Sequence, residues 1–130
     1  MTLRRSASFL VPFLLCLALG PLAAAELTFD RYHKPEELTA AVQELARANP
    51  GFAKVHVLAK SPGGRELVLL ELGPETAKAA KSLPAVFIAA NMEGTVPISG
   101  EAALFLAKLV CEKADMRSDR TWYILPCGNP

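Results

Sequence analysis

Hydrophobic and polar positions recur along the chain with two different periods. Apolar residues three and four positions apart predict one helix over residues 33–51 and another over residues 97–114. Apolar stretches on either side of the turn at 62–64 (Pro-Gly-Gly) predict a β-hairpin, and shorter apolar runs predict strands at 85–91 and 122–125. The order helix, hairpin, strand, helix, strand predicts an α/β fold in which a sheet packs against helices.

The second predicted helix carries an apolar stripe that should face the core. We expect Glu101, Lys108 and Glu112 to face water. Glu101 should also interact with backbone donors near the start of the helix, where the helix dipole favours a carboxylate. The members of the stripe are Ile98, Ala102, Phe105, Leu106, Leu109 and Val110.

The first 25 residues have the pattern of a secretory signal peptide. Arg4 and Arg5 precede an apolar stretch over residues 9–22, and the alanines at 23–25 form a small-residue cleavage site. The stretch is short and interrupted by Pro and Gly, which disfavours the alternative of an uncleaved membrane anchor. The sequence therefore predicts export to the periplasm or the extracellular space. It also predicts one small domain over residues 26–130, with no stable membrane span after cleavage.

Charge and cysteine content narrow the possible functions. The full chain has 14 basic and 13 acidic residues, and removal of the two leader arginines leaves one acidic residue in excess. This near-neutral balance argues against binding to nucleic acid or to another polyanion. Cys111 and Cys127 remain in the predicted domain, and their spacing fits no zinc knuckle. Whether they pair depends on a geometry that the sequence does not reveal.

One segment has the layout of a functional site. Residues 87–101 contain the end of a predicted strand, a short loop with a single carboxylate, Glu93, and the start of a helix. In α/β sheets, ligands bind at the carboxyl ends of strands, where loops meet helix N-termini. We therefore place the candidate site at this loop.

Five motifs follow one another in register over almost the whole predicted domain. They are Tyr-His at 32–33, Ser-x-x-Gly-Arg-Glu at 61–66, the apolar strand with its loop at 84–97, the helix after it, and Leu-Pro-x-x-Asn-Pro at 125–130. In this order they resemble the opening of the zinc carboxypeptidase family, the carboxypeptidase A/B-like peptidases. The resemblance implies the N-terminal portion of that fold, an incomplete mixed β-sheet with packed helices. It also implies a zinc-dependent hydrolase of peptide bonds.

The resemblance further implies where zinc would bind. The family's metal loop reads His-x-x-Glu, and these two side chains reach one zinc ion together with a later His. On that pattern this chain has Glu93 at the His position and Val96 at the Glu position, whereas Gly94, Pro97 and Glu101 match. Glu93 could offer a carboxylate oxygen, but Val96 has no ligand atom. We therefore expect no zinc, no other bound cofactor and no catalytic residue in this chain.

The remaining family residues have no counterpart among these 130 positions. They are the second zinc His, the catalytic Glu and the residues that grip the substrate. His33 should pack in the structure and His56 should lie on a strand face, so neither replaces them. The chain alone is predicted to be inactive as a peptidase.

Several explanations remain open at this stage. A truncated sequence is favoured because the last strand runs directly into the final turn, but a pseudogene product or part of a larger non-catalytic relative would also fit. A protein of another class is the alternative, a non-catalytic exported module that binds peptide or peptidoglycan. A third possibility is that Glu93 has a new role together with residues beyond Pro130.

Overall fold

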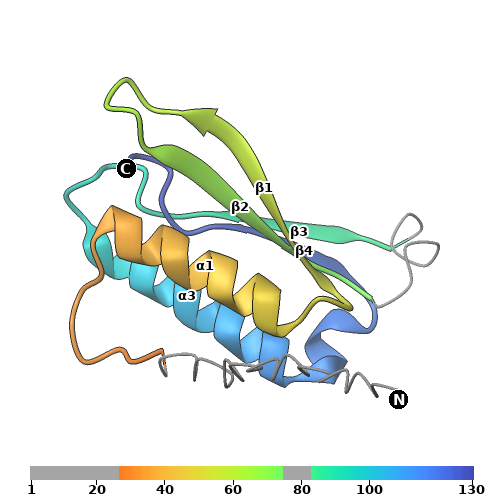
Figure 1. Ribbon diagram of the computed structural model, residues 1–130. Helices are drawn as coiled ribbons and strands as arrows, with labels where there is room; N and C mark the ends of the chain where they lie inside the picture. Colours follow the sequence, from red (N-terminus) through yellow and green to blue (C-terminus); the bar gives the residue numbers. More distant parts are fainter. Residues whose placement is uncertain (1–26, 75–82) are drawn as a thin grey trace, which may run out of the picture.

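Among the described residues, two helices and four strands follow one another in the order predicted from the sequence. The computed structural model describes residues 27–74 and 83–130 (Figure 1), so the predicted leader lies outside the described residues. No helix within these two ranges is long and apolar enough to cross a membrane. The sequence pattern did not predict the short 3-10 helix η1. The elements are α1 (Pro35–Ala48), β1 (Ala53–Lys60), β2 (Glu66–Leu72), β3 (Ala85–Ala89), α3 (Pro97–Glu112), η1 (Ala114–Arg117) and β4 (Thr121–Leu125).

The four strands form one mixed sheet in the order β1-β2-β4-β3. β2 is antiparallel to both β1 and β4, whereas β3 and β4 are parallel. Both helices lie on the same face of this twisted sheet (Figure 1). The α/β class and the mixed sheet with packed helices are therefore confirmed, and among the described strands β1 and β3 are the outermost.

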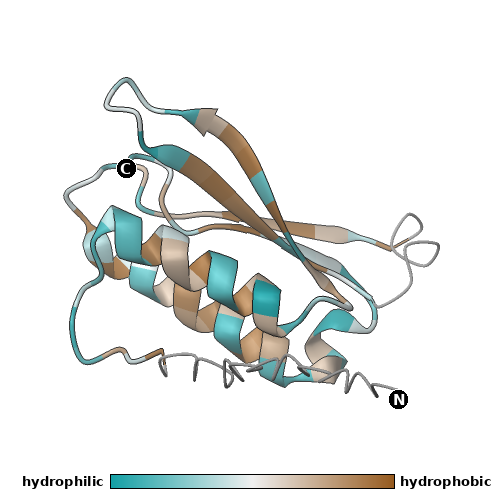
Figure 2. Cartoon of the chain, in the orientation of Figure 1, coloured by the Kyte–Doolittle hydropathy of each residue, from teal (hydrophilic) through white to brown (hydrophobic). Residues whose placement is uncertain are grey.

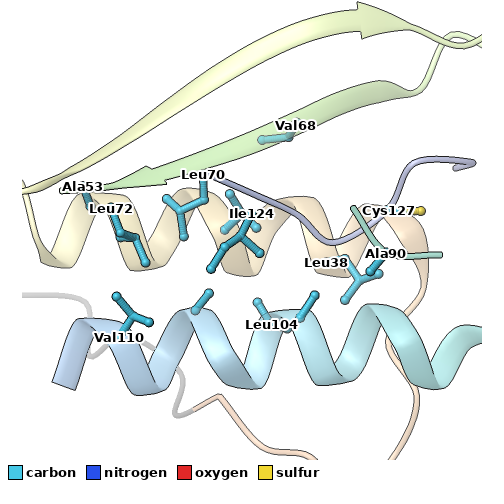
Figure 3. Close-up of a cluster of buried hydrophobic side chains, with 13 residues drawn as sticks. Leu38, Ala53, Val68, Leu70, Leu72, Ala90, Leu104, Val110, Ile124 and Cys127 are labelled. Atoms are coloured by element: carbon cyan, nitrogen blue, oxygen red, sulfur yellow. The ribbon is translucent and has the colours of Figure 1, made fainter. Parts of the chain in front are cut away.

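The core lies between the sheet and the two helices. Alternate residues of β2 are buried against the helices, because successive side chains of a strand point to opposite faces. Figure 3 shows Leu70 and Ile124 pointing from the sheet toward α3, where Leu104 and Val110 point back. Full burial of one such side chain is worth about 1.5–3 kcal/mol. The largest fully buried side chains are Val42, Leu70, Leu72, Leu104, Val110 and Ile124.

The buried face of helix α3 matches the predicted one only in part, since Val110 of the predicted stripe is buried but other members are not. Ile98 and Phe105, expected in the core, are 56% and 52% exposed, whereas Glu101, expected to face water, is 6% exposed. Hydrophobic residues occur along most of α3 (Figure 2), so their spacing could not fix which side faces the sheet. The small residues of the buried face allow α3 to lie close to its neighbours. The buried positions are Gly100, Glu101, Ala103, Leu104, Ala107 and Val110.

The segment before α1 is tied to the first turn of that helix. The Arg31 guanidinium donates hydrogen bonds of 2.9 and 3.0 Å to the Glu37 carboxylate, and the Lys34 N–H donates another of 2.8 Å. These bonds lower the pKa of Glu37 to about 2. Because the folded-state pKa is lowered, the stabilisation is present above the ordinary carboxyl pKa of 4.5 and is lost as the pH falls toward 2. Both side chains are partly exposed, so salt weakens the interaction.

We expect Leu104→Ala to lower the free energy of unfolding by about 3 kcal/mol, because it leaves a cavity between α3 and the sheet. Phe105→Ala, at the next position, is the control. It removes a half-exposed ring, so its cost should be clearly smaller. Urea titration followed by circular dichroism measures both losses. A larger loss for Phe105→Ala would favour the helix face predicted from the sequence.

Candidate functional site

The loop between β3 and α3 runs beside the loop that follows β4. The Gly128 N–H donates to the Ala90 carbonyl at 2.9 Å, and the Asn129 N–H donates to the Asn91 carbonyl at 3.0 Å. Since β3 and β4 are parallel, their carboxyl ends lie at the same end of the sheet. The predicted site therefore lies where α/β proteins bind ligands.

Asn91 holds the start of this loop in place. It is buried and has a backbone φ of 49°, a left-handed conformation that Asn adopts more readily than most residues. Its N–H donates to Ser99 Oγ at 2.8 Å, and its side-chain amide donates to Cys127 Sγ at 3.1 Å. The Ser99 hydroxyl in turn donates to the Val96 carbonyl at 2.9 Å. One network thus joins the ends of β3 and β4 to the start of α3.

The two positions of the expected metal loop contribute no side chain to this network. Glu93 is exposed, and Val96, directly before α3, is 42% exposed. The Glu93 carbonyl accepts a hydrogen bond from the Thr95 N–H within the loop. Among the described residues, its carboxylate has no hydrogen-bond or ion-pair partner. Glu93 is therefore an exposed acid of the loop between β3 and α3.

The most buried ionisable contact near the loop joins His33 to Glu101. The His33 N–H donates to Glu101 Oε1 at 2.5 Å, and His33 Nδ1 lies 2.8 Å from Glu101 Oε2. The two side chains are only 9% and 8% exposed. A buried carboxylate is costly unless it is hydrogen-bonded, and here both of its oxygens have a partner. The pair therefore anchors the segment before α1 to the first turn of α3.

The sequence interpretation missed this pair. Glu101 was expected to interact with backbone donors near the start of its helix, but the donor is His33, 68 residues earlier in the chain. No periodicity links such distant positions. The available signal was that both residues belong to the motifs on which the family resemblance rests.

A groove of about 670 Å³ lies between the segment before α1 and the outer face of α3. Phe29 packs edge-to-face on Phe105, with ring centroids 5.3 Å apart, at one side of this groove. Glu101 also contributes to its lining, together with the charged residues Asp30 and Arg31. The groove is therefore mainly apolar, with charged groups among its lining residues.

Comparison with known proteins identifies the family. The sequence model described as zinc carboxypeptidase matches residues 38–130. The chain belongs to the zinc carboxypeptidase family. Human carboxypeptidase D is 33% identical over 135 residues, which cover 82% of this chain and 10% of that protein. The catalytic chain of human carboxypeptidase N is 29% identical over 114 residues, which cover 82% of this chain and 25% of that protein.

Two solved structures share the fold of this family member. Carboxypeptidase A from Helicoverpa armigera has a TM-score of 0.73 and 29% identity, over 80% of this chain and 26% of the insect chain. Bovine thrombin-activatable fibrinolysis inhibitor, in complex with tick carboxypeptidase inhibitor, has a TM-score of 0.63. At 17% identity, that second likeness shows the fold alone. This chain spans only about a tenth to a quarter of the human relatives.

The residues at the metal-loop positions of this carboxypeptidase relative do not fit zinc. A catalytic zinc site takes three converging protein ligands, with water at a fourth position. Here Glu93 offers one carboxylate, and Val96 offers none. Within residues 27–74 and 83–130, no three or more His, Cys, Asp or Glu side chains are grouped so that they could hold a metal ion.

The other residues singled out in the sequence are separate from the loop or bonded within it. His56 Nε2 lies 2.7 Å from Glu71 Oε2 on the surface of the β1–β2 hairpin, so the predicted strand-face position is confirmed.

Cys111 and Cys127 are free thiols. Cys111 lies near the C-terminus of α3 and Cys127 near its N-terminus, and a helix rises about 1.5 Å per residue, so the two are too far apart to pair. Burial raises the pKa of Cys111 to about 11.

We expect Glu101→Ala to lower the free energy of unfolding by about 3 kcal/mol, because it leaves the buried donors of His33 without an acceptor. It should also release the segment before α1, so that trypsin cleaves faster after Arg31. Glu112→Ala is the matched control, since Glu112 is an exposed acid of the same helix. Urea titration and timed proteolysis followed by mass spectrometry measure the two effects. Equal cleavage rates in both variants would show that the pair does not anchor the segment.

Proposed function

We propose that this chain is an exported, non-catalytic member of the zinc carboxypeptidase family that does not hydrolyse peptide bonds by itself. The proposal rests on one observation, which is the set of side chains that the loop after β3 offers to a metal ion. One exposed carboxylate, Glu93, and one valine, Val96, occupy the two ligand positions. The family implies peptides as the substrate class.

The chemistry of the family explains why these ligand positions matter. A zinc ion held by three protein ligands makes its bound water acidic enough to attack a carbonyl at neutral pH. A single solvated carboxylate provides neither the affinity nor the fixed geometry for such an ion. The chain thus has the strand, the loop and the helix of the family's site, but not the side chains that would bind zinc there.

Export is the second part of the proposal. It rests on the arginine pair, the apolar stretch and the alanines within residues 1–25, with the domain beginning at Glu26. Expression of the full chain in an exporting bacterial host should give a protein whose first residue is Glu26 by intact mass. A product that keeps residues 1–25 would contradict export by cleavage.

The chain as purified should contain no stoichiometric zinc. The double variant Glu93→His with Val96→Glu returns two of the family's three ligands to the loop and should bind zinc or cobalt, but weakly, because a third protein ligand is still missing. The single variant Val96→Glu is the control, because it supplies two carboxylates but no imidazole. Metal content by mass spectrometry and the absorption of bound cobalt measure the result. Stoichiometric zinc in the unmodified chain, lost on Glu93→Ala, would overturn the proposal.

The same experiment also tests the loop itself. If the double variant keeps the circular dichroism of the parent but binds cobalt no better than the Val96→Glu control does, the loop does not hold the two positions as a metal loop would. In that case the retained motif residues Gly94, Pro97 and Glu101 would support only the fold.

A second candidate function is a peptide-binding module, which the groove between the segment before α1 and α3 favours. Its exposed apolar residues suit an apolar side chain of a bound peptide. Ile98→Lys places a charge in the groove and should abolish binding to a panel of apolar peptides, measured by calorimetry. Binding to peptidoglycan but to no peptide would instead favour a cell-wall module. The apolar residues that line the groove are Phe29, Tyr32, Ile98, Ala102 and Phe105.

A further inference from the structure

The segment before α1, residues 27–34, is packed against the rest of the domain from its first described residue. Leu27 and Phe29 are half-buried and contact the hydrophobic core. The Phe29 ring also packs edge-to-face on the rings of His33 and Phe105, with centroids 6.2 and 5.3 Å away. Together with the buried histidine–glutamate pair, these contacts hold the segment along its length. All of the partners lie in the same domain, so the contacts need no other part of the protein.

The predicted cleavage site lies next to this packed segment. Only Glu26 stands between Leu27 and the bond after Ala25 that a signal peptidase would cut. Hydrolysis of that bond adds one water molecule, which leaves a carboxylate on Ala25 and a free amino group on Glu26. Proteases cut segments that are free of packing or that open transiently. The packed form of the segment is therefore a poor substrate, because Leu27 is held on the core.

The contact that fixes the segment cannot form early in synthesis. The partner of His33 is Glu101, which is made 68 residues later. At a synthesis rate of about 5–20 residues per second, adding those 68 residues takes about 3–14 s. During that time the segment has no helix α3 on which to pack, and the bond after Ala25 remains open to a protease.

We propose that the leader is removed before the segment before α1 packs on α3, and that this packing makes the cleavage bond inaccessible. The inference rests on the proposed export, because it needs the leader predicted over residues 1–25. A chain that still lacks α3 is cut rapidly. A precursor that has folded with its leader in place is cut only when the segment opens. Glu101 is a positioning residue in this step, because it acts through the segment and not at the bond itself.

The test uses the full chain of 130 residues, made by cell-free translation and treated with purified bacterial signal peptidase. The enzyme is added either during synthesis or after synthesis is complete, and the mass of the product gives the fraction cut. Cleavage by the late enzyme should be at least about tenfold slower, because a hydrogen bond to a charged group alone shifts an opening equilibrium by about that factor. Equal rates would overturn the proposed order. No cleavage under either condition would overturn the predicted export as well.

Two variants test whether Glu101 controls access to the bond. Glu101→Ala removes the acceptor of the His33 donors and should raise the late cleavage rate at least about tenfold. Glu112→Ala is the matched control, because Glu112 is an exposed acid of the same helix, and its late cleavage should stay as slow as that of the parent. The same late rate in both variants would contradict the role given to Glu101.

An insertion covers the case in which Glu101→Ala unfolds the domain. A flexible linker of about six Gly and Ser residues between Glu26 and Leu27 moves the bond up to about 20 Å from the packed segment and removes none of its contacts. The late cleavage rate should then equal the early rate. The same linker between Gly63 and Gly64, in the turn of the β1–β2 hairpin, is the control and should leave late cleavage slow. Slow late cleavage of the first insertion variant would show that packing of the segment does not block the bond.

Discussion

The close approach of α3 to the end of β4 and to α1 is the constraint on which the rest of the structure depends. A Cβ atom on Gly100 would lie 3.0 Å from the Pro126 carbonyl oxygen and 3.2 Å from a methyl carbon of Leu38. Only glycine fits this contact without moving its neighbours. Because Gly100 fixes which side of α3 faces inward, Glu101 is placed under the segment before α1, where it meets His33. The same contact brings the first turn of α3 against the two loops that follow β3 and β4.

The bonds that hold the loop between β3 and α3 do not involve the side chains at the two expected ligand positions. Backbone hydrogen bonds from the loop after β4 and the bonds of Asn91 with Ser99 and Cys127 hold the loop in place. None of these bonds uses the side chain of Glu93 or Val96. Substitution at those two positions therefore removes none of these hydrogen bonds. A family member can lose its zinc ligands and keep the strand, the loop and the helix that present them.

The elements and the fold class could be predicted from the sequence because their signals are local. Spacing of apolar residues, turn residues and proline at the helix starts are read over a few positions, and the structure confirms the order they predict. The buried face of α3 could not be predicted, because that helix is apolar on several sides and its orientation is set by contacts with Leu38 and Pro126. The partner of Glu101 is 68 residues away, which no local pattern reaches. The cysteine pairing stayed open for the same reason, since it depended on the position of each thiol along α3.

The sequence of β2 predicts that both faces of the sheet are covered, but the two helices cover only one. β2 is apolar at nearly every position, a pattern typical of strands covered on both faces, yet both helices lie on one face. On the other face, the row of directly opposite residues Lys54, Glu71, Tyr123 and Phe87 is charged over β1 and β2 and aromatic over β4 and β3. About three quarters of the insect carboxypeptidase has no counterpart in this chain, so the relative has further structure with which to cover its sheet.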